Sequence, residues 1–370
     1  MANQSVSKPR FWLDFTQLLR AKGYFLNPSD YGSRNATSGA FVNEDGDSDI
    51  SADKNINVWE LDYTNPTKFI AGHPNIGWRF WLTPSNISLP KEWRKLLSTI
   101  NWLGFINHNI APLWRDLPSP LTITDDMIDL WIDGNSNLIY HTATSYVNGD
   151  FHSNGYSIFT LSPDSQPLDS VYWHAITIGF SIPGYVAQNF ENTEFELGAI
   201  PFGKYIDIDS SPDLSVKKTV EYDGSKSYRT VGGSDISTSD YQGQPDWLVG
   251  EPWTLKNYES SGRVGRNGRR SWELTFSYLS NDDVFYDWQE LVVGGSAETS
   301  DGVEGDFNST SEIQQIWDLT LGGALSFVFT PDKDATNPEF AVCRLDQESL
   351  VVTQVAYQTW NISMRVVEVW

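Results

Sequence analysis

The sequence predicts a mainly β protein, built as two β-sandwich domains with a few short helices. Three observations lead to this prediction. Apolar residues alternate with polar ones over short segments bounded by turn residues, which is typical of half-buried strands. Few helical segments separate these strands, and this favours antiparallel sandwiches over a parallel doubly wound sheet. The length of 370 residues suits two domains of ordinary size.

The first elements are mixed. A short helix is predicted over residues 11–21, because apolar side chains fall on one helical face before Gly23 ends it. Residues 28–53 are rich in Ser, Asn, Asp and Gly and predict a long loop. A second helix follows Pro90, and its apolar stripe indicates core packing. That stripe consists of Trp93, Leu96, Leu97 and Ile100.

Most of the remaining chain predicts strands, of which residues 271–278 alternate most strictly. A helix between the later strands begins at a capping box of Ser309 and Glu312 and ends at Gly322 and Gly323. The domain boundary is expected between residues 203 and 212. The predicted strands are Ile123–Ile139, Tyr156–Leu161, Tyr172–Phe180, Ser271–Tyr278, Leu325–Thr330, Ala341–Leu345, Leu350–Val355 and Asn361–Trp370.

The composition excludes several classes of protein. With 25 basic and 48 acidic residues, the chain has a net charge of −23 and repels phosphate backbones, so general nucleic-acid binding is not expected. No run approaches the roughly 18 apolar residues of a membrane span, and the polar N-terminus is unlike a signal peptide. The single cysteine, Cys343, is expected to be a buried thiol in a strand. It leaves the redox compartment open.

The charge is distributed unevenly. Residues 216–270 hold 9 basic and 7 acidic residues, whereas residues 271–370 hold 3 basic and 17 acidic ones. This pattern suits contact between complementary surfaces, within the fold or between identical subunits, although a loop beside an acidic sheet has the same pattern. The candidate subunit contacts are Arg263, Arg266, Arg269 and Arg270. Charge reversal at the last two is expected to disrupt assembly and leave the monomer folded.

No catalytic motif is present. The glycines between residues 262 and 268 lack the spacing and the Lys-Ser/Thr of a phosphate loop, and the five histidines show no zinc-binding pattern. No Gly-x-Ser-x-Gly elbow occurs. Glycoside hydrolysis, which needs only two suitably placed carboxylates, is the enzymatic alternative. We expect the protein not to be an enzyme.

Two sets of residues suggest ligands. Asp45, Asp47, Asp49 and Asp53 match the oxygen-ligand spacing of a calcium loop, but Ile50 and Ile56 replace the glycine and glutamate of an EF-hand. A looser Ca²⁺ site and a solvated acidic loop both remain open, and no other cofactor is expected. Trp78, Trp81 and Trp114 could stack on sugar rings, with core packing as the alternative.

Part of the chain resembles a known domain. Residues 100–109 (INWLGFINHN), 172–178 (YWHAITI) and 196–203 (ELGAIPFG) resemble the galactose-binding-like jelly roll found in many phage tail proteins. In that pattern a hydrophobic strand ends in His-Asn, a later strand begins with an aromatic pair, and a final strand closes on a glycine. The resemblance covers about residues 55–205. It departs from the pattern in the polar stretch between Ile139 and Ser170.

The second half is similar to virion structural proteins of marine tailed bacteriophages. The resemblance covers nearly all of residues 205–370 and lies in the order of several segments. These are Pro212–Leu214 (PDL), Tyr222–Gly224 (YDG), Arg229–Gly233 (RTVGG), Arg269–Leu279 (RRSWELTFSYL), Leu325–Asp332 (LSFVFTPD), Ala341–Leu345 (AVCRL) and Asn361–Val369 (NISMRVVEV).

The resemblance implies an N-terminal arm and loop (1–54), a jelly roll (55–205) and a β domain like those of tail-tube and distal-tail proteins (206–370). It implies a structural protein of the virion tail, near the tail tip or baseplate, that forms a homo-oligomeric ring and contacts other tail proteins. Such a chain would accumulate in the bacterial host cytoplasm before assembly. The alternative function is a carbohydrate-binding module for host-surface polysaccharide.

Overall fold

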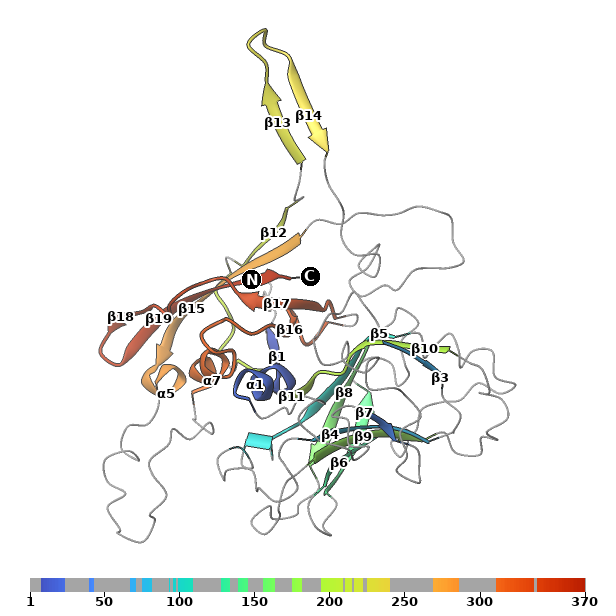
Figure 1. The fold of residues 1–370 in the computed structure, drawn as a ribbon. Helices are drawn as coiled ribbons and strands as arrows, with labels where there is room; N and C mark the ends of the chain where they lie inside the picture. The colour runs from blue at the N-terminus through green and yellow to red at the C-terminus, as the bar shows by residue number, and fades with distance from the viewer. Residues whose placement is uncertain are drawn as a thin grey trace.

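The chain is mainly β, and every described strand pairing is antiparallel (Figure 1). Seventeen strands are linked into one hydrogen-bonded system, and two more form a separate hairpin. The computed structural model describes residues 8–23, 40–42, 67–70, 75–81, 93, 96–97, 99–108, 128–133, 139–145, 156–163, 175–181, 194–208, 210–214, 216–221, 225–239, 269–285, 311–335 and 338–369.

The strands of the first half form a continuous path. They are β2 (Ala40–Val42), β3 (Thr67–Ile70), β4 (Asn75–Trp81), β5 (Trp102–His108), β6 (Ile128–Asp133), β7 (Ile139–Ser145), β8 (Tyr156–Pro163), β9 (Ala175–Ser181), β10 (Glu194–Ala199) and β11 (Phe202–Asp207). The path runs β2–β4–β9–β6–β7–β8–β5, and β5 then pairs with β10 and β11. The region predicted as one strand over residues 123–139 contains β6 and the start of β7.

The strands of the second half also form a continuous path of antiparallel pairs. Its strands are β12 (Lys217–Glu221), β15 (Arg269–Ser280), β16 (Phe327–Thr330), β17 (Ala341–Leu345), β18 (Val352–Ala356) and β19 (Thr359–Glu368). The path runs β16–β17–β19–β15–β12, and β18 pairs with the first part of β19. The separate hairpin consists of β13 (Ser225–Arg229) and β14 (Asp235–Ser239). The strands predicted after residue 270 are confirmed, with shifts of a few residues at their ends.

Strand β1 (Arg10–Asp14) joins the two halves. It pairs along one edge with β11 and along the other with β16, and all five of its residues are buried. A methyl group on Gly203 would lie 2.2 Å from the carbonyl oxygen of Leu13, so only glycine permits this approach of β11 to β1. Residues 10–14 therefore connect strands on both sides of the expected boundary, and the division into two domains stays a prediction.

The helix predicted over residues 11–21 is confirmed only from residue 15 onward, because residues 11–14 belong to strand β1. Helix α1 (Phe15–Ala21) begins only after β1 and is capped by Asp14. The prediction failed over residues 11–14 because a strand buried on both faces has no period-2 alternation. The stripe after Pro90 is confirmed as core, since its four apolar residues are at most 5% exposed.

Two further helices lie in the described part of the second half. Helix α5 (Asn281–Val284) follows β15 directly, and helix α7 (Glu312–Leu319) precedes β16. The cap of α7 is Ser311, whose hydroxyl accepts a hydrogen bond from the Gln314 amide, so the predicted cap at Ser309 is corrected by two residues. Gly322 and Gly323 follow the helix with positive φ, as a helix end requires.

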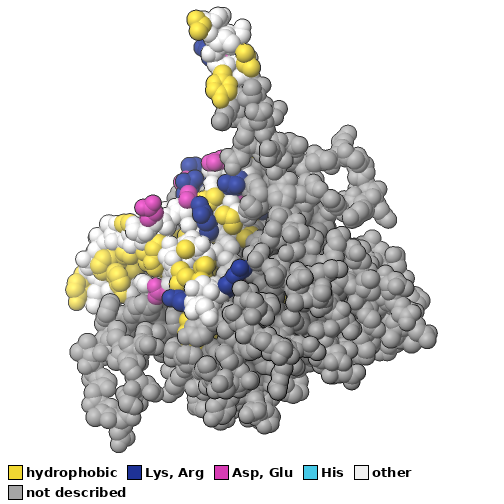
Figure 2. All heavy atoms as spheres, in the orientation of Figure 1, with side chains coloured by type: hydrophobic (Ala, Val, Ile, Leu, Met, Phe, Trp, Pro, Cys, Tyr) yellow, Lys and Arg dark blue, Asp and Glu magenta, His cyan; other side chains and the backbone are white. Residues whose placement is uncertain are grey.

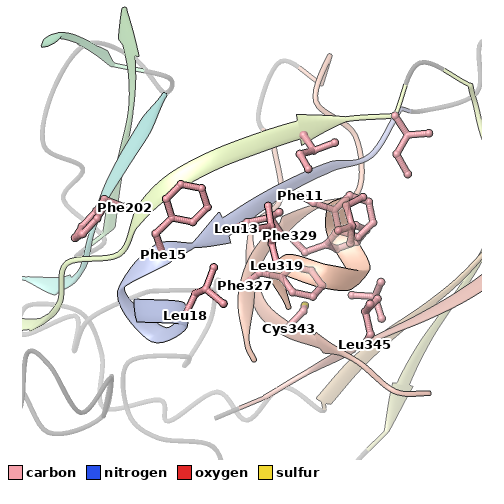
Figure 3. Packing of buried hydrophobic residues seen from close by; sticks show 14 of the residues in the cluster. Phe11, Leu13, Phe15, Leu18, Phe202, Leu319, Phe327, Phe329, Cys343 and Leu345 are labelled. Atoms are coloured by element: carbon pink, nitrogen blue, oxygen red, sulfur yellow. The ribbon is translucent and has the colours of Figure 1, made fainter. Parts of the chain in front are cut away.

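One large hydrophobic cluster spans both halves. Phe11 of β1 lies 5.5 Å from Phe327 and 5.2 Å from Phe329, measured between ring centroids. Figure 3 shows these rings packed beside Cys343 and Leu345 of β17, while Phe15 of α1 and Phe202 of β11 lie further along the same cluster. Cys343 is fully buried in its strand, as the sequence predicted. Burial raises the pKa of its thiol well above the ordinary value.

Candidate assembly surfaces

Most of the residues singled out from the sequence lie outside the described part of the chain. Asp45, Asp47, Asp49 and Asp53, the candidate calcium ligands, are outside it, and so are Arg263, Arg266 and Trp114. Trp78 and Trp81 belong to β4, but their side chains are not among those described. The described residues contain no cluster of three or more His, Cys, Asp or Glu side chains suited to a metal.

Arg270 lies in β15 and not in a loop, and its side chain is bound within the chain. Its Nε donates to Glu368 Oε2 at 2.9 Å, and its Nη2 donates to Glu368 Oε1 at 2.6 Å. The Nη1 group bonds Glu339, which also accepts from Lys218 Nζ at 2.7 Å. Arg270 and Glu368 are only 9% and 2% exposed. The expected contact of Arg270 with another subunit is therefore not retained, whereas Arg269 stands beside it as a half-buried residue.

The electrostatics of this cluster are those of a structural ion pair. Burial alone would lower the pKa of Arg270, but the hydrogen bonds and charges of Glu368 and Glu339 outweigh it and raise that pKa. For Glu339, burial acts to raise the pKa, and the contacts with Lys218 and Arg270 outweigh burial and lower it. The charged forms are thus mutually stabilised, and the cluster ties β12, β15 and β19 together.

The hairpin β13–β14 projects from the body of the molecule (Figure 1). Among the described strands, β13 and β14 pair only with each other. Their turn is well defined: the Gly233 amide donates to the Thr230 carbonyl at 2.9 Å, and the Thr230 amide donates to the Ser234 carbonyl at 2.8 Å. Gly233 has φ +85, which the left-handed position of such a three-residue loop requires.

The hairpin exposes large apolar side chains. Tyr228 and Ile236 face each other across the two strands and are about half exposed, and Val231 at the turn is fully exposed. Beside them Arg229 and Asp235 form a loose ion pair at 4.0 Å. Figure 2 shows hydrophobic side chains on this projection. An isolated two-stranded hairpin is at best marginally stable in water, so these side chains form a surface suited to a partner.

A second apolar surface lies along β18. Leu350 and Val352 pack against the core, whereas Val351 is exposed and so is every residue of β18 from Thr353 to Ala356. Tyr357 and Tyr278 extend the surface at 86% and 80% exposure. Figure 2 shows hydrophobic side chains gathered over this end of the molecule, where Figure 1 places β15, β18 and β19. Within the described strands, β18 pairs only with β19.

The two edges of this sheet differ in chemistry. Edge strand β12 carries Lys217, Lys218 and Glu221, and such charges discourage pairing with another strand. Edge strand β18 has the sequence VTQVA, without charge or proline. It belongs to an uncharged run from Ser349 to Met364, inside the most acidic part of the chain. An uncharged, exposed edge is a template for β-pairing.

Sequence reasoning missed both surfaces, although signals for them were present. Gly232 and Gly233 between two Ser/Thr-rich segments indicate a hairpin. The absence of charge from residues 349–364 marks an unprotected edge. What the sequence does not show is that β13 and β14 pair with no other described strand.

Among the described side chains, His108 Nε2 lies 2.9 Å from Ser157 Oγ, and both side chains are buried. None of the described helices has the length and apolar character needed to cross a membrane.

Comparison of the chain with protein-family models, with curated proteins and with solved structures gave no match.

Proposed function

We propose that this protein is a non-enzymatic structural component of a bacteriophage tail, near the tip or baseplate, that assembles into a homo-oligomeric ring. The observation that carries the proposal is the projecting hairpin β13–β14, which exposes Tyr228, Val231 and Ile236. The tail assignment itself rests on the resemblance of residues 205–370 to virion proteins.

The geometry supports assembly on two grounds. First, a hairpin with no described strand beside it gains stability when a neighbouring subunit covers its apolar face. Second, the body around it holds together through buried contacts such as Arg270–Glu368, so a subunit can fold before it assembles. The charge of −23 then opposes premature association in the cytoplasm.

The test is the mass of the purified full-length protein by light-scattering chromatography at several concentrations and salt concentrations, with electron microscopy of the same fractions. We expect closed rings of uniform diameter, because a neighbouring subunit covers the exposed apolar face of the hairpin. A strict monomer at every concentration and salt would contradict ring assembly. Titration with host polysaccharide would then test the glycan-binding alternative.

A further inference from the structure

Residues 8–23 comprise β1 and α1 and lie between the two halves of the chain, with β1 paired to β11 on one side and to β16 on the other. We propose that this segment is a separable peptide ligand of its own chain. It occupies a slot whose walls are β11 and β16, and it can leave and rebind while the strands on both sides stay folded. Ring assembly is not required for this behaviour.

Each wall of the slot has its own connection to the half that it belongs to. On the β11 side, the Asn101 amide donates to the Gly203 carbonyl at 2.8 Å, and the Tyr205 amide donates to Asn101 Oδ1 at 2.7 Å. On the other side, β16 pairs with β17, with Phe327 opposite Cys343. Both walls are thus attached to their halves by hydrogen bonds that do not involve β1.

Among the described strands, β1 alone pairs with strands of both halves. Direct contact between the halves also occurs where α7 touches β11, and there Lys204 Nζ donates to Gln315 Oε1 at 2.7 Å. The backbone pairing that joins the halves is short, since β1 pairs with β16 only over Arg10–Trp12, whereas β15 pairs with β19 from Ser271 to Ser280. Opening a short pairing costs less free energy than unfolding a long one.

The Trp12 side chain contacts both walls of the slot. Its Nε1 donates to Thr330 Oγ1 of β16 at 2.9 Å. Its ring lies 5.3 Å from that of Tyr205 in β11 and 5.5 Å from that of Trp102 in β5, measured between centroids. Trp102 Nε1 in turn donates to the Leu13 carbonyl at 3.0 Å. A fully buried indole with this set of partners is a typical anchor of a bound peptide.

Polar side chains fix both ends of the segment in the slot. Near one end, Arg10 binds Asp207 through two hydrogen bonds of 2.5 and 2.6 Å. In α1, Gln17 Nε2 donates to the Ser326 carbonyl at 3.0 Å, while the Ser326 amide donates back to Gln17 Oε1 at 3.2 Å. One end is thus bound to the first half and the other to the second. Side-chain contacts of this kind add specificity to main-chain pairing when a peptide binds as a strand.

The experiment uses the full-length chain with a protease site inserted after Gly23. A side chain at Gly23 would meet no described atom within 4 Å, so the insertion is expected to leave the segment bound. The folded protein is cut at this site and then mixed with an excess of a fluorescent peptide of residues 8–23. Fluorescence anisotropy measures uptake of the peptide at rising denaturant concentration. Hydrogen exchange by mass spectrometry follows β5, β8, β15 and β19 in the same samples.

We expect the fluorescent peptide to replace the cut segment at denaturant concentrations that leave the four strands protected from exchange. A peptide with Trp12→Ala should bind at least ~100-fold more weakly, because it lacks the buried indole. A peptide with Lys22→Ala is the matched control. Lys22 is exposed, so its affinity should stay within about 2-fold of that of the native peptide.

A variant of the slot shows where the peptide binds. Thr330→Val in the cut protein removes the acceptor of the Trp12 indole, so the native peptide should bind at least ~5-fold more weakly. A Trp12→Phe peptide has no indole N–H, so its affinity should be the same for both proteins. The comparison of peptides on the unsubstituted slot remains decisive if Thr330→Val does not fold.

Three results would overturn the inference. The peptide could enter only at denaturant concentrations at which β15 and β19 also lose protection, which would make residues 8–23 an inseparable part of the core. Departure of the segment could remove protection from the strands of either half. The native and Trp12→Ala peptides could bind equally well, which would place the peptide outside the slot. Each of these results leaves ring assembly untouched, because that is measured on the uncut wild type.

Discussion

Asp14 shows how one residue serves two elements at once. Its carboxylate ends β1, accepts from the Thr16 amide at 2.8 Å to cap α1, and accepts from Gln17 Nε2 at 3.0 Å. Burial raises the pKa of Asp14 from 3.8 to about 6, and the hydrogen bonds from Gln17 and Thr16 only partly offset this. The folded state thus holds this proton more tightly than the unfolded chain does.

This shift predicts a pH dependence of stability. Because the folded pKa is the higher one, the contribution of Asp14 is present below pH 3.8 and is lost as the pH rises through 6. Asp14→Asn keeps a capping oxygen and removes the titration, so we expect the variant to be about 1–2 kcal/mol more stable than wild type at pH 7. Denaturant titrations from pH 4 to 7 would measure this difference.

The comparison is between two proteins that share every other carboxyl group. Asp318, whose pKa burial also raises to about 6, is unchanged in the variant and cancels from the difference. A stability difference between wild type and Asp14→Asn that does not change between pH 4 and 7 would contradict the shifted pKa of Asp14.

Arg270 gives the second prediction at this scale. Arg270→Met leaves Glu368 buried without its guanidinium partner, and removing one member of a buried pair typically costs about 3–5 kcal/mol. We expect a loss of that order in the free energy of unfolding. The double variant Arg270→Met/Glu368→Leu should recover most of it, since no unpaired charge is then buried. Equal losses in both variants would show that packing, not charge pairing, sets the cost.

At the scale of elements, the cap of α7 links two helices. Ser311 Oγ accepts from the Gln314 amide at 3.2 Å and donates to the Asp283 carbonyl of α5 at 2.9 Å. Ser311→Ala removes both bonds at a buried position, so we expect a loss of about 1–2 kcal/mol in unfolding free energy. Ser309→Ala is the matched control, because the sequence favoured Ser309 as the cap. A larger loss of unfolding free energy in Ser309→Ala than in Ser311→Ala would show that Ser309 is the cap.

The sequence predicted elements well where one face is buried and the other is not. Strand β15 shows this, because Trp272, Leu274 and Phe276 face the core while Glu273 is exposed. It failed at β1, where Phe11, Trp12 and Leu13 are all buried and the pattern resembles a buried helix. The pairing of Trp12 with Val328 joins strands from opposite ends of the chain, and local periodicity holds no information on such a contact.

Assembly surfaces were harder to predict than the core for a related reason. The basic residues near Arg270 suggested a surface contact, but a charge pattern does not distinguish a buried pair from an exposed one. The apolar residues of the hairpin, such as Ile236, look like core positions in sequence. Only the structure shows that they are exposed, on a hairpin whose two strands pair with no other described strand.

At the scale of the whole molecule, net charge and apolar exposure oppose each other. At pH 7 the charge of −23 makes copies repel each other, although Val231, Tyr357 and other large apolar side chains are exposed. As the pH falls toward the isoelectric point near 4.4, the repulsion vanishes while the exposed apolar area remains. We therefore expect light scattering of dilute protein to rise steeply as the pH is lowered through about one unit above the isoelectric point. The carboxylates begin to protonate in this range.

A variant in which a short Gly-Ser linker replaces residues 225–239 separates the two contributions. Its isoelectric point is nearly that of wild type, because the removed segment contains only Lys226, Arg229 and Asp235 as charged residues. It lacks the exposed face of Tyr228 and Ile236, so its scattering should rise at the same pH but less steeply. Identical curves for the two proteins would show that loss of charge alone drives association, and that the hairpin contributes no adhesive surface.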